Sequence, residues 1–198
     1  MARAMTIASE ISFGTYNTRR NLPAHIGCRR SEANFVGAFL KRFMAKAPAG
    51  SWCGRHFAVP DCGVADCIVF KLEGDVKAEL AMGRLLAFEA KLSDWRKALN
   101  QAYRYRYYAD VSIVILPVQA ARSAIENRDL FQQMGVGLWT FNPGSGAICP
   151  RIAVKTPTPL STRKREQALI RIERSALQLR KLRKVAQALQ HSQQVVSV

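Results

Sequence analysis

The sequence predicts an α/β fold: a mixed central sheet flanked by helices, followed by a basic amphipathic helix at the C-terminal end. The first observation is an order of segments, which alternate between helical periodicity and short apolar runs as helix, strand, strand, helix, strand, helix, strand. The second is that the later strands are joined through helices, which favours parallel pairing. We therefore expect helices on both faces of one sheet.

The first expected helix begins near Ser31, a good N-cap residue, and continues through residues 32–46. Pro48 and Gly50 end it. Its apolar residues recur at helical spacing, so one side is expected to be buried. These residues are Phe35, Val36, Phe39, Leu40, Phe43 and Met44.

Two strands are expected next. Residues 64–70 form a short apolar run that holds one aspartate, Asp66. Gly74 allows a turn, and residues 85–92 then read as a buried strand that contains Glu89 and Lys91. A glutamate and a lysine two residues apart are common in proteins and indicate little alone. The aspartate on the preceding strand gives the pair more weight as a candidate site.

The second half of the domain alternates helix and strand. A helix from Asp94 to about Tyr108 has Ser93 as a plausible cap. A β-branched strand follows and stops at Pro117. The three later elements are a strand at 111–117, a helix at 120–134 ended by Gly135, and a strand at 136–141.

The C-terminal region is predicted to be helical and basic. After an extended "KTPTP" linker, residues 161–190 carry apolar side chains at steps of three or four, with basic residues at most other positions. The pattern fits equally a helix docked on its own domain, a helix that forms a homodimer, or a nucleic-acid clamp. We expect an arm at 1–28, a domain at 29–150, a linker at 151–162 and a basic tail at 163–198.

The charge of the chain predicts a polyanionic partner. The formal net charge is +16, and residues 151–198 hold 11 Lys and Arg against two Asp and Glu. Such a charge favours nucleic acid, DNA in our interpretation, over an anionic membrane surface or a ribosome-like assembly. No apolar run is long enough to span a membrane. Five cysteines are an odd number, which fits a reducing cytoplasm better than a disulfide framework.

Three charged residues on the two central strands form the candidate chemistry. Side chains at i and i+2 of a strand share a face, so Glu89 and Lys91 project together. If the strands are neighbours, Asp66 and Glu89 approach within reach of a shared cation, and carboxylate oxygens suit Mg²⁺ or Mn²⁺. Lys91 would orient an attacking water or neutralise charge on a phosphate. The alternative is an ordinary ion pair on a partly exposed strand.

These residues resemble the motif of the PD-(D/E)XK nuclease superfamily, which has the restriction-endonuclease-like fold. Asp66 takes the place of the first acidic residue, and Glu89-Ala90-Lys91 is similar to the (D/E)-x-K element. Gln101 and Tyr105 resemble the Q-x-x-x-Y motif of an exonuclease branch, and Glu32 matches a recurrent helix glutamate. The resemblance covers about residues 29–142. The literal Pro-Asp pair is Pro60-Asp61, so Asp61 stays an alternative to Asp66.

The resemblance implies a role for each residue. Asp66, Glu89 and the carbonyl of Ala90 would bind one or two divalent ions, with Glu32 completing the shell directly or through water. Lys91 would position the nucleophilic water. Gln101 and Tyr105 would steady the active site or touch the phosphate backbone. Two further expected nucleic-acid contacts on the same helix are Lys97 and Arg104.

The expected function is a metal-dependent nuclease that hydrolyses phosphodiester bonds in DNA. The main alternative is a non-catalytic nucleic-acid-binding protein that keeps the fold, and a third is an assembly protein whose tail binds a partner helix. A zinc site is a weaker possibility because its candidate ligands are irregularly spaced. These ligands are Cys53, His56, Cys62 and Cys67.

Overall fold

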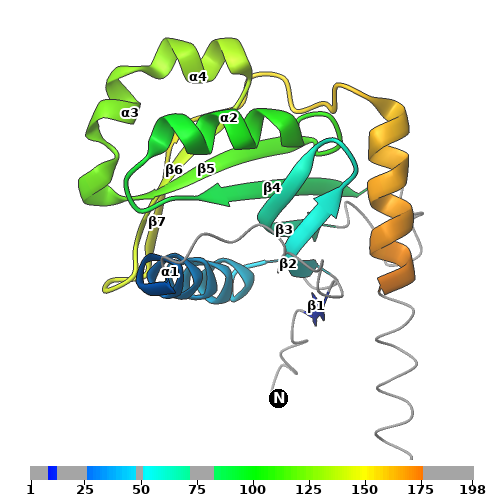
Figure 1. Cartoon of the computed structure of the whole chain (residues 1–198), viewed down its shortest axis with the longest axis horizontal. Helices are drawn as coiled ribbons and strands as arrows, with labels where there is room; N and C mark the ends of the chain where they lie inside the picture. Colours follow the sequence, from blue (N-terminus) through cyan, green and yellow to red (C-terminus); the bar gives the residue numbers. More distant parts are fainter. Residues whose placement is uncertain (1–8, 13–25, 48–50, 72–82, 176–198) are drawn as a thin grey trace, which may run out of the picture.

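The computed structural model describes residues 9–12, 26–47, 51–71 and 83–175, which fold around one sheet of seven strands (Figure 1). The strands lie side by side in chain order: β1 Ser9–Ser12, β2 Trp52–Val59, β3 Gly63–Lys71, β4 Arg84–Ala90, β5 Val111–Pro117, β6 Gly137–Asn142 and β7 Ala147–Ile152. The helices are α1 Ile26–Met44, α2 Trp95–Tyr105, the 3₁₀ turn η3 Val118–Ala120, α3 Arg122–Glu126 and α4 Arg128–Met134. Residues 162–175 are also helical.

The sheet is mixed, as the sequence predicted. β2, β3 and β4 are antiparallel neighbours, and β6 and β7 are also antiparallel. The pairs β4–β5 and β5–β6 are parallel, which confirms the pairing expected for strands joined through helices. The outermost strand β1 is parallel to β2.

Each face of the sheet has its own hydrophobic core. On one face, α1 packs Phe35, Phe39 and Leu40 against residues of β3 to β6. On the other face, α2 and the C-terminal helical segment pack against β2 to β6. Figure 1 shows α1 and α2 on opposite sides of the sheet, so the expected helices on both faces are confirmed.

Several expected boundaries were wrong. Helix α1 begins at Ile26, because residues 26–30 are compatible with a helix and extend it upstream of Ser31. The N-cap of α2 is Asp94, whose Oδ1 accepts a hydrogen bond from the Lys97 N–H at 3.0 Å, and not Ser93. The single helix expected at 120–134 is divided at Asn127, whose ψ of 35° is not helical.

Three strands were missed. β1 and β7 are the outer strands of the sheet, and such strands depend on hydrogen bonds to one partner more than on an apolar pattern of their own. In β2, the run Gly54-Arg55-His56 interrupts the apolar residues, and His56 has a positive φ of 54°. These local features hide a strand that its pairing with β3 stabilises.

The C-terminal part of the domain differs from the expected division. β7 extends to Ile152, across the boundary placed at residue 150, and the end of the expected linker is tied to the domain by the Leu160 N–H, which donates to the Arg106 carbonyl at 2.7 Å. In the helix at 162–175, Ala168 and Ile172 are fully buried. Arg165 of this helix forms an ion pair with Asp110, with 2.6 Å between Arg165 Nη1 and Asp110 Oδ2.

The described part of the tail therefore packs on its own domain, which was the first of the three expected arrangements. The rest of the tail, residues 176–198, lies outside the described residues. The prediction that the tail forms a homodimer concerns this segment as well. Within the described ranges, no helix combines the length and the apolarity that crossing a membrane requires.

Candidate active site

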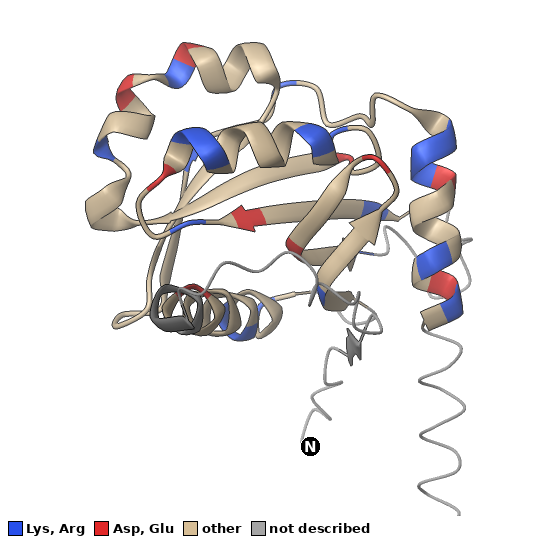
Figure 2. Ribbon diagram, in the orientation of Figure 1, with Lys and Arg blue, Asp and Glu red and all other residues tan. Residues whose placement is uncertain are grey.

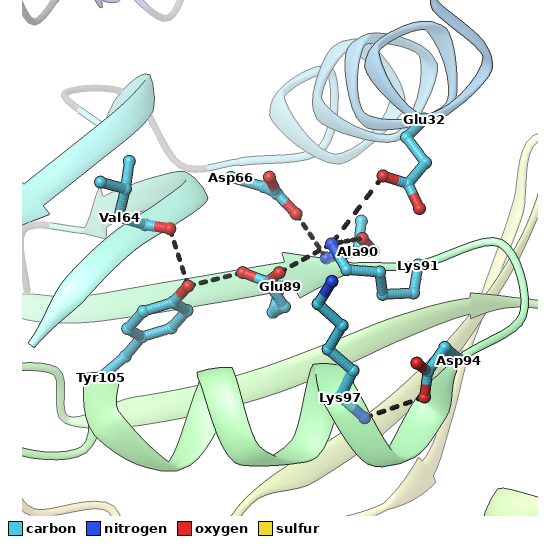
Figure 3. Close-up of polar contacts among 9 residues, drawn as sticks. All are labelled: Glu32, Val64, Asp66, Glu89, Ala90, Lys91, Asp94, Lys97 and Tyr105. Atoms are coloured by element: carbon cyan, nitrogen blue, oxygen red, sulfur yellow. Dashed lines mark hydrogen bonds and ion pairs between the residues drawn. The ribbon is translucent and has the colours of Figure 1, made fainter. Parts of the chain in front are cut away.

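Strands β3 and β4 bring the two expected carboxylates together. Cys67 pairs with Phe88 in the antiparallel register, which places Asp66 beside Glu89. The Ala90 N–H, at the end of β4, donates a hydrogen bond to Asp66 Oδ2 at 2.8 Å. The condition set from the sequence, that these strands are neighbours, is therefore met, and Figure 3 shows the Asp66 carboxylate directed toward the end of β4.

Glu89 is the most enclosed member of this group. Only 1% of the residue is exposed, and both carboxyl oxygens have partners. Lys91 Nζ lies 2.9 Å from Oε1, and the Tyr105 hydroxyl lies 2.6 Å from Oε2. A buried carboxylate with two fixed partners is held in one orientation, as a ligand or an electrostatic group requires.

The ammonium of Lys91 lies among three oxygen atoms (Figure 3). Its Nζ is 2.9 Å from Glu89 Oε1, 3.2 Å from the Ala90 carbonyl and 3.8 Å from Glu32 Oε2. Burial alone would lower the pKa of Lys91, but the charges of Glu89, Asp66 and Glu32 raise it above its ordinary 10.5. Lys91 is therefore a cation at neutral pH, held by three of the groups predicted to bind a metal.

Tyr105 supports Glu89 from the last position of α2. The residue is fully buried, so the expectation that it touches nucleic acid was wrong, and its position fits the expectation that it steadies the site. Its hydroxyl lies 2.7 Å from the Val64 carbonyl and 2.6 Å from Glu89 Oε2. A phenol carries one proton, so these two oxygens compete for it unless Glu89 itself is protonated.

The pKa of Glu89 bears on where the Tyr105 hydroxyl proton lies. This pKa is raised from the ordinary 4.5 to about 7, mainly by burial and then by the nearby charge of Asp66. Lys91 and Tyr105 act in the opposite direction but are weaker. When Glu89 is ionised, the Tyr105 hydroxyl can donate its one proton to Glu89 Oε2 or to the Val64 carbonyl, and Lys91 donates to Glu89 Oε1.

The other residues expected on α2 lie around this group. Figure 3 shows the Lys97 side chain directed from α2 toward Glu89 and Lys91. Gln101 lies one turn before Tyr105, and its buried Oε1 has no hydrogen-bond partner among the described residues. Arg104 is exposed and lies near the β2–β3 turn, where its guanidinium would be 3.6 Å from a Cβ at Gly63.

Asp61, the alternative to Asp66, lies elsewhere. It is in the turn between β2 and β3, its side chain is exposed, and it pairs with Lys164 at 2.9 Å. Hydrogen bonding to Lys164 lowers the pKa of Asp61. The structure therefore places Asp66, and not Asp61, beside Glu89.

The possible zinc ligands do not share one site. Cys53 and Cys67 belong to the core under α1, whereas Cys62 belongs to the core on the opposite face. Burial raises the pKa of the Cys67 thiol, which opposes the thiolate form that zinc binds. Across the described residues, no group of three or more His, Cys, Asp or Glu side chains is arranged to hold a metal.

That last finding includes the carboxylate cluster, which we define as Asp66, Glu89, Lys91 and Glu32. The carboxylates of this cluster and the neighbouring Ala90 carbonyl nevertheless offer oxygen donors, the type that Mg²⁺ and Mn²⁺ prefer. Oxygens of Glu89, Ala90 and Glu32 lie around one cation. In this structure that cation is the Lys91 ammonium. The donor set therefore fits a divalent ion if Lys91 moves.

Comparisons with known proteins leave the family open: no family model, no curated protein and no solved structure matches the chain. What the chain does must therefore be inferred from its own geometry and charge. Two features that the sequence pattern had not indicated belong to that inference. They are the bond between Tyr105 and Glu89 and a cationic pocket at the far end of α1, described below.

Proposed function

We propose that this protein is a metal-dependent nuclease of the restriction-endonuclease-like fold that hydrolyses phosphodiester bonds in DNA. The observation that carries the proposal is the carboxylate cluster. Two carboxylates from neighbouring antiparallel strands, a lysine and a helix glutamate meet around one point at the end of β4. A net charge of +16 supports a polyanionic substrate.

The cluster would hold Mg²⁺ or Mn²⁺ through Asp66, Glu89 and the Ala90 carbonyl, with Glu32 as a further ligand directly or through water. Such an ion supplies a water of lowered pKa and neutralises charge on the phosphate. Lys91 now makes contacts to Glu89, Ala90 and Glu32 that it would have to give up. Glu89 would also lose its proton, which its raised pKa makes available near neutral pH.

The side chains around the ion have distinct roles in this proposal. Lys91 stays charged, so it donates to the attacking water or to a phosphate oxygen and does not act as a base. Tyr105 keeps Glu89 in place from beneath. Gln101 offers a buried oxygen that a bound water can satisfy, and Lys97 reaches the phosphate of the strand being cut.

The test compares two aspartates of the same hairpin. Asp66→Asn removes a charged oxygen from the cluster, whereas Asp61→Asn changes an exposed aspartate in the turn. We would incubate each variant with plasmid, linear, single-stranded and branched DNA, with Mg²⁺, Mn²⁺ or EDTA. The proposal expects cleavage by the wild type and by Asp61→Asn with metal, and none by Asp66→Asn or in EDTA.

Two results would count against the enzyme. The first is that the wild type leaves all substrates intact with either metal. The second is that Asp66→Asn cleaves as fast as Asp61→Asn, which would place the activity outside the cluster or in a contaminant. Product lengths from the cleaved substrates distinguish internal from terminal cutting.

A nucleic-acid-binding protein without catalysis is the second candidate. It is favoured by the contacts of Lys91, because an ammonium already neutralises the oxygens that a metal would need. This candidate expects salt-dependent binding to DNA that is the same in Mg²⁺ and in EDTA. It also expects Asp66→Asn to bind as tightly as the wild type and to cleave nothing, as the wild type would.

A further inference from the structure

A second site lies at the other end of α1, on the face of the sheet that this helix covers. A cavity of about 530 Å³ opens between the C-terminal end of this helix and the turn that joins β6 to β7. Ligand pockets usually fall in the range of about 300–1,000 Å³. We call it the cationic pocket; its wall includes Arg42, Phe43, Lys46, Lys71, Trp139 and Ile148, and among the described residues no Asp or Glu lines it.

The pocket has an aromatic surface made of two partly exposed rings. Phe43 and Trp139 lie with their ring centroids 5.7 Å apart, and Phe88 supports Trp139 from the core at the same distance. The Lys71 ammonium lies over the Phe43 ring, 5.0 Å from its centroid. Since a cation already covers Phe43, the half-buried ring of Trp139 is the surface on which a planar group can stack.

Positive side chains surround this ring. Lys46 is exposed at the mouth, and Arg42 is fixed there because its Nε donates to the Gly146 carbonyl at 3.1 Å. Gly146 has a φ of 69°, and a Cβ at this position would lie 2.9 Å from Arg42 Nε, so glycine permits the approach. The terminal nitrogens of Arg42 make no hydrogen bond within the described residues, and they can receive an anion.

The cationic pocket is separate from the carboxylate cluster. Glu32 and Phe43 lie on the same helix, about 16 Å apart at 1.5 Å of rise per residue. The two sites share no residue, and their charges are opposite. A molecule held in the pocket therefore does not need the cluster, although a strand of a few nucleotides can reach both.

We propose that the cationic pocket binds a nucleotide unit of a single-stranded nucleic acid, with the base stacked on Trp139 and the phosphate held by Arg42 and Lys46. Aromatic rings beside cations are the usual means of binding single strands. Bases of a duplex are stacked on each other and cannot enter. A free nucleotide carries the same chemistry, so the test separates the two sources.

The experiment measures binding by the full chain in EDTA, where no metal-dependent cleavage occurs. Isothermal titration with unlabelled (dT)₆ gives the affinity of each variant. Trp139→Leu should weaken binding about ten-fold, because stacking on an aromatic side chain is lost. Lys46→Ala should weaken it roughly three- to ten-fold, whereas Lys41→Ala, an exposed lysine of α1 outside the pocket, should change it by less than about two-fold.

Further arms identify the ligand. If thymidine 5′-monophosphate binds as tightly as (dT)₆, the ligand of the pocket is a free nucleotide. If (dT)₆ binds more tightly, the ligand is a single strand. Trp139→Phe retains an aromatic face and should keep most of the affinity, which also guards against misfolding of Trp139→Leu. Inorganic phosphate competing as well as the nucleotide, or a hexamer duplex binding as well as (dT)₆, would overturn the proposal.

The inference does not depend on the proposed nuclease. In EDTA, Trp139→Leu and Lys46→Ala should lose affinity for (dT)₆ whether or not the wild type cleaves DNA when metal is present. Equal losses of (dT)₆ affinity in Lys46→Ala and Lys41→Ala would overturn the proposal for the pocket and would not bear on the carboxylate cluster. An inactive protein with a selective pocket would overturn the nuclease and leave this site in place.

Discussion

The two ends of α1 lie beside sites of opposite charge. Near its N-terminal end, Glu32 joins the carboxylate cluster, where acidic groups converge on a lysine. At its C-terminal end, Arg42 and Lys46 line the cationic pocket beside exposed ring surface. The cluster is enclosed and fixed by strands, whereas the pocket is open. Figure 2 shows both kinds of charge on the helix.

The difference separates two tasks that a protein acting on nucleic acid must perform. Buried carboxylates repel a phosphate unless a cation is present, so the cluster is suited to chemistry and poorly suited to binding on its own. Exposed cations attract a phosphate but leave its bonds unchanged. Variants of the two sites should therefore affect different measurements, and the following predictions use this.

The largest effect is expected for Lys91→Ala in the cluster. Turnover at saturating Mg²⁺ should fall by about 10²–10⁴-fold, because a charge that stabilises the transition state is removed. The affinity for Mg²⁺ should rise at the same time, since Lys91 no longer competes for the oxygens of Glu89 and Ala90. Metal titration and single-turnover cleavage measure the two effects.

The control is Lys155→Ala, which changes an exposed lysine outside the site and should leave both the turnover and the Mg²⁺ affinity unchanged. A weaker Mg²⁺ affinity in Lys91→Ala would contradict the competition between Lys91 and the metal.

The next effect joins the two regions through Phe88. This fully buried residue of β4 precedes Glu89, and its ring contacts Phe39, Phe43 and Trp139. Phe88→Ala should lower the free energy of unfolding by about 3–5 kcal/mol. Urea denaturation measures the loss. Phe88→Leu should lose much less of the free energy of unfolding. A loss of under about 1 kcal/mol in Phe88→Ala would show that the Phe88 side chain does not stabilise the region between the pocket and the cluster.

The sequence predicted the cluster better than the pocket because of how each is built. Glu89 and Lys91 are two residues apart on one strand, and Asp66 lies on the adjacent strand, so alternation and neighbouring pairing suffice to bring them together. The pocket combines residues 42, 43, 46, 47, 71, 139, 145–148 and 150, which only the tertiary fold assembles. No local spacing connects Lys46 with Trp139.

The fold was predicted in its centre and less well at its margins. The order of the central strands and the parallel pairing followed from apolar runs and helical connections. β2 was missed because Arg55 and His56 interrupt its apolar pattern, and β7 because a short outer strand carries little pattern. The burial of Ala168 and Ile172 against the domain also depends on tertiary contacts, so the tail pattern alone left three arrangements open.

A smaller effect concerns the proton on Glu89. Its raised pKa means that the folded protein holds a proton which the unfolded chain releases above pH 4.5. The free energy of unfolding in EDTA should therefore fall as the pH rises from about 4.5 to about 7, by on the order of 1–3 kcal/mol. The stability difference between wild type and Glu89→Gln isolates this contribution. It should change between pH 5 and pH 8, whereas Glu126→Gln, an exposed residue of α3, should show no such change.

The smallest effect tests how the cationic pocket holds its ligand. A lysine that neutralises one phosphate of a single strand contributes about −0.7 to the slope of log affinity against log salt. Lys46→Ala should therefore make this slope for (dT)₆ shallower by about 0.7, while Lys41→Ala leaves it unchanged. Trp139→Phe should keep the wild-type slope, since its ring contributes stacking and no charge. A parallel change in the slopes of both lysine variants would mean that α1 attracts nucleic acid along its whole exposed side, and the contrast between its two ends would then be one of burial and not of binding.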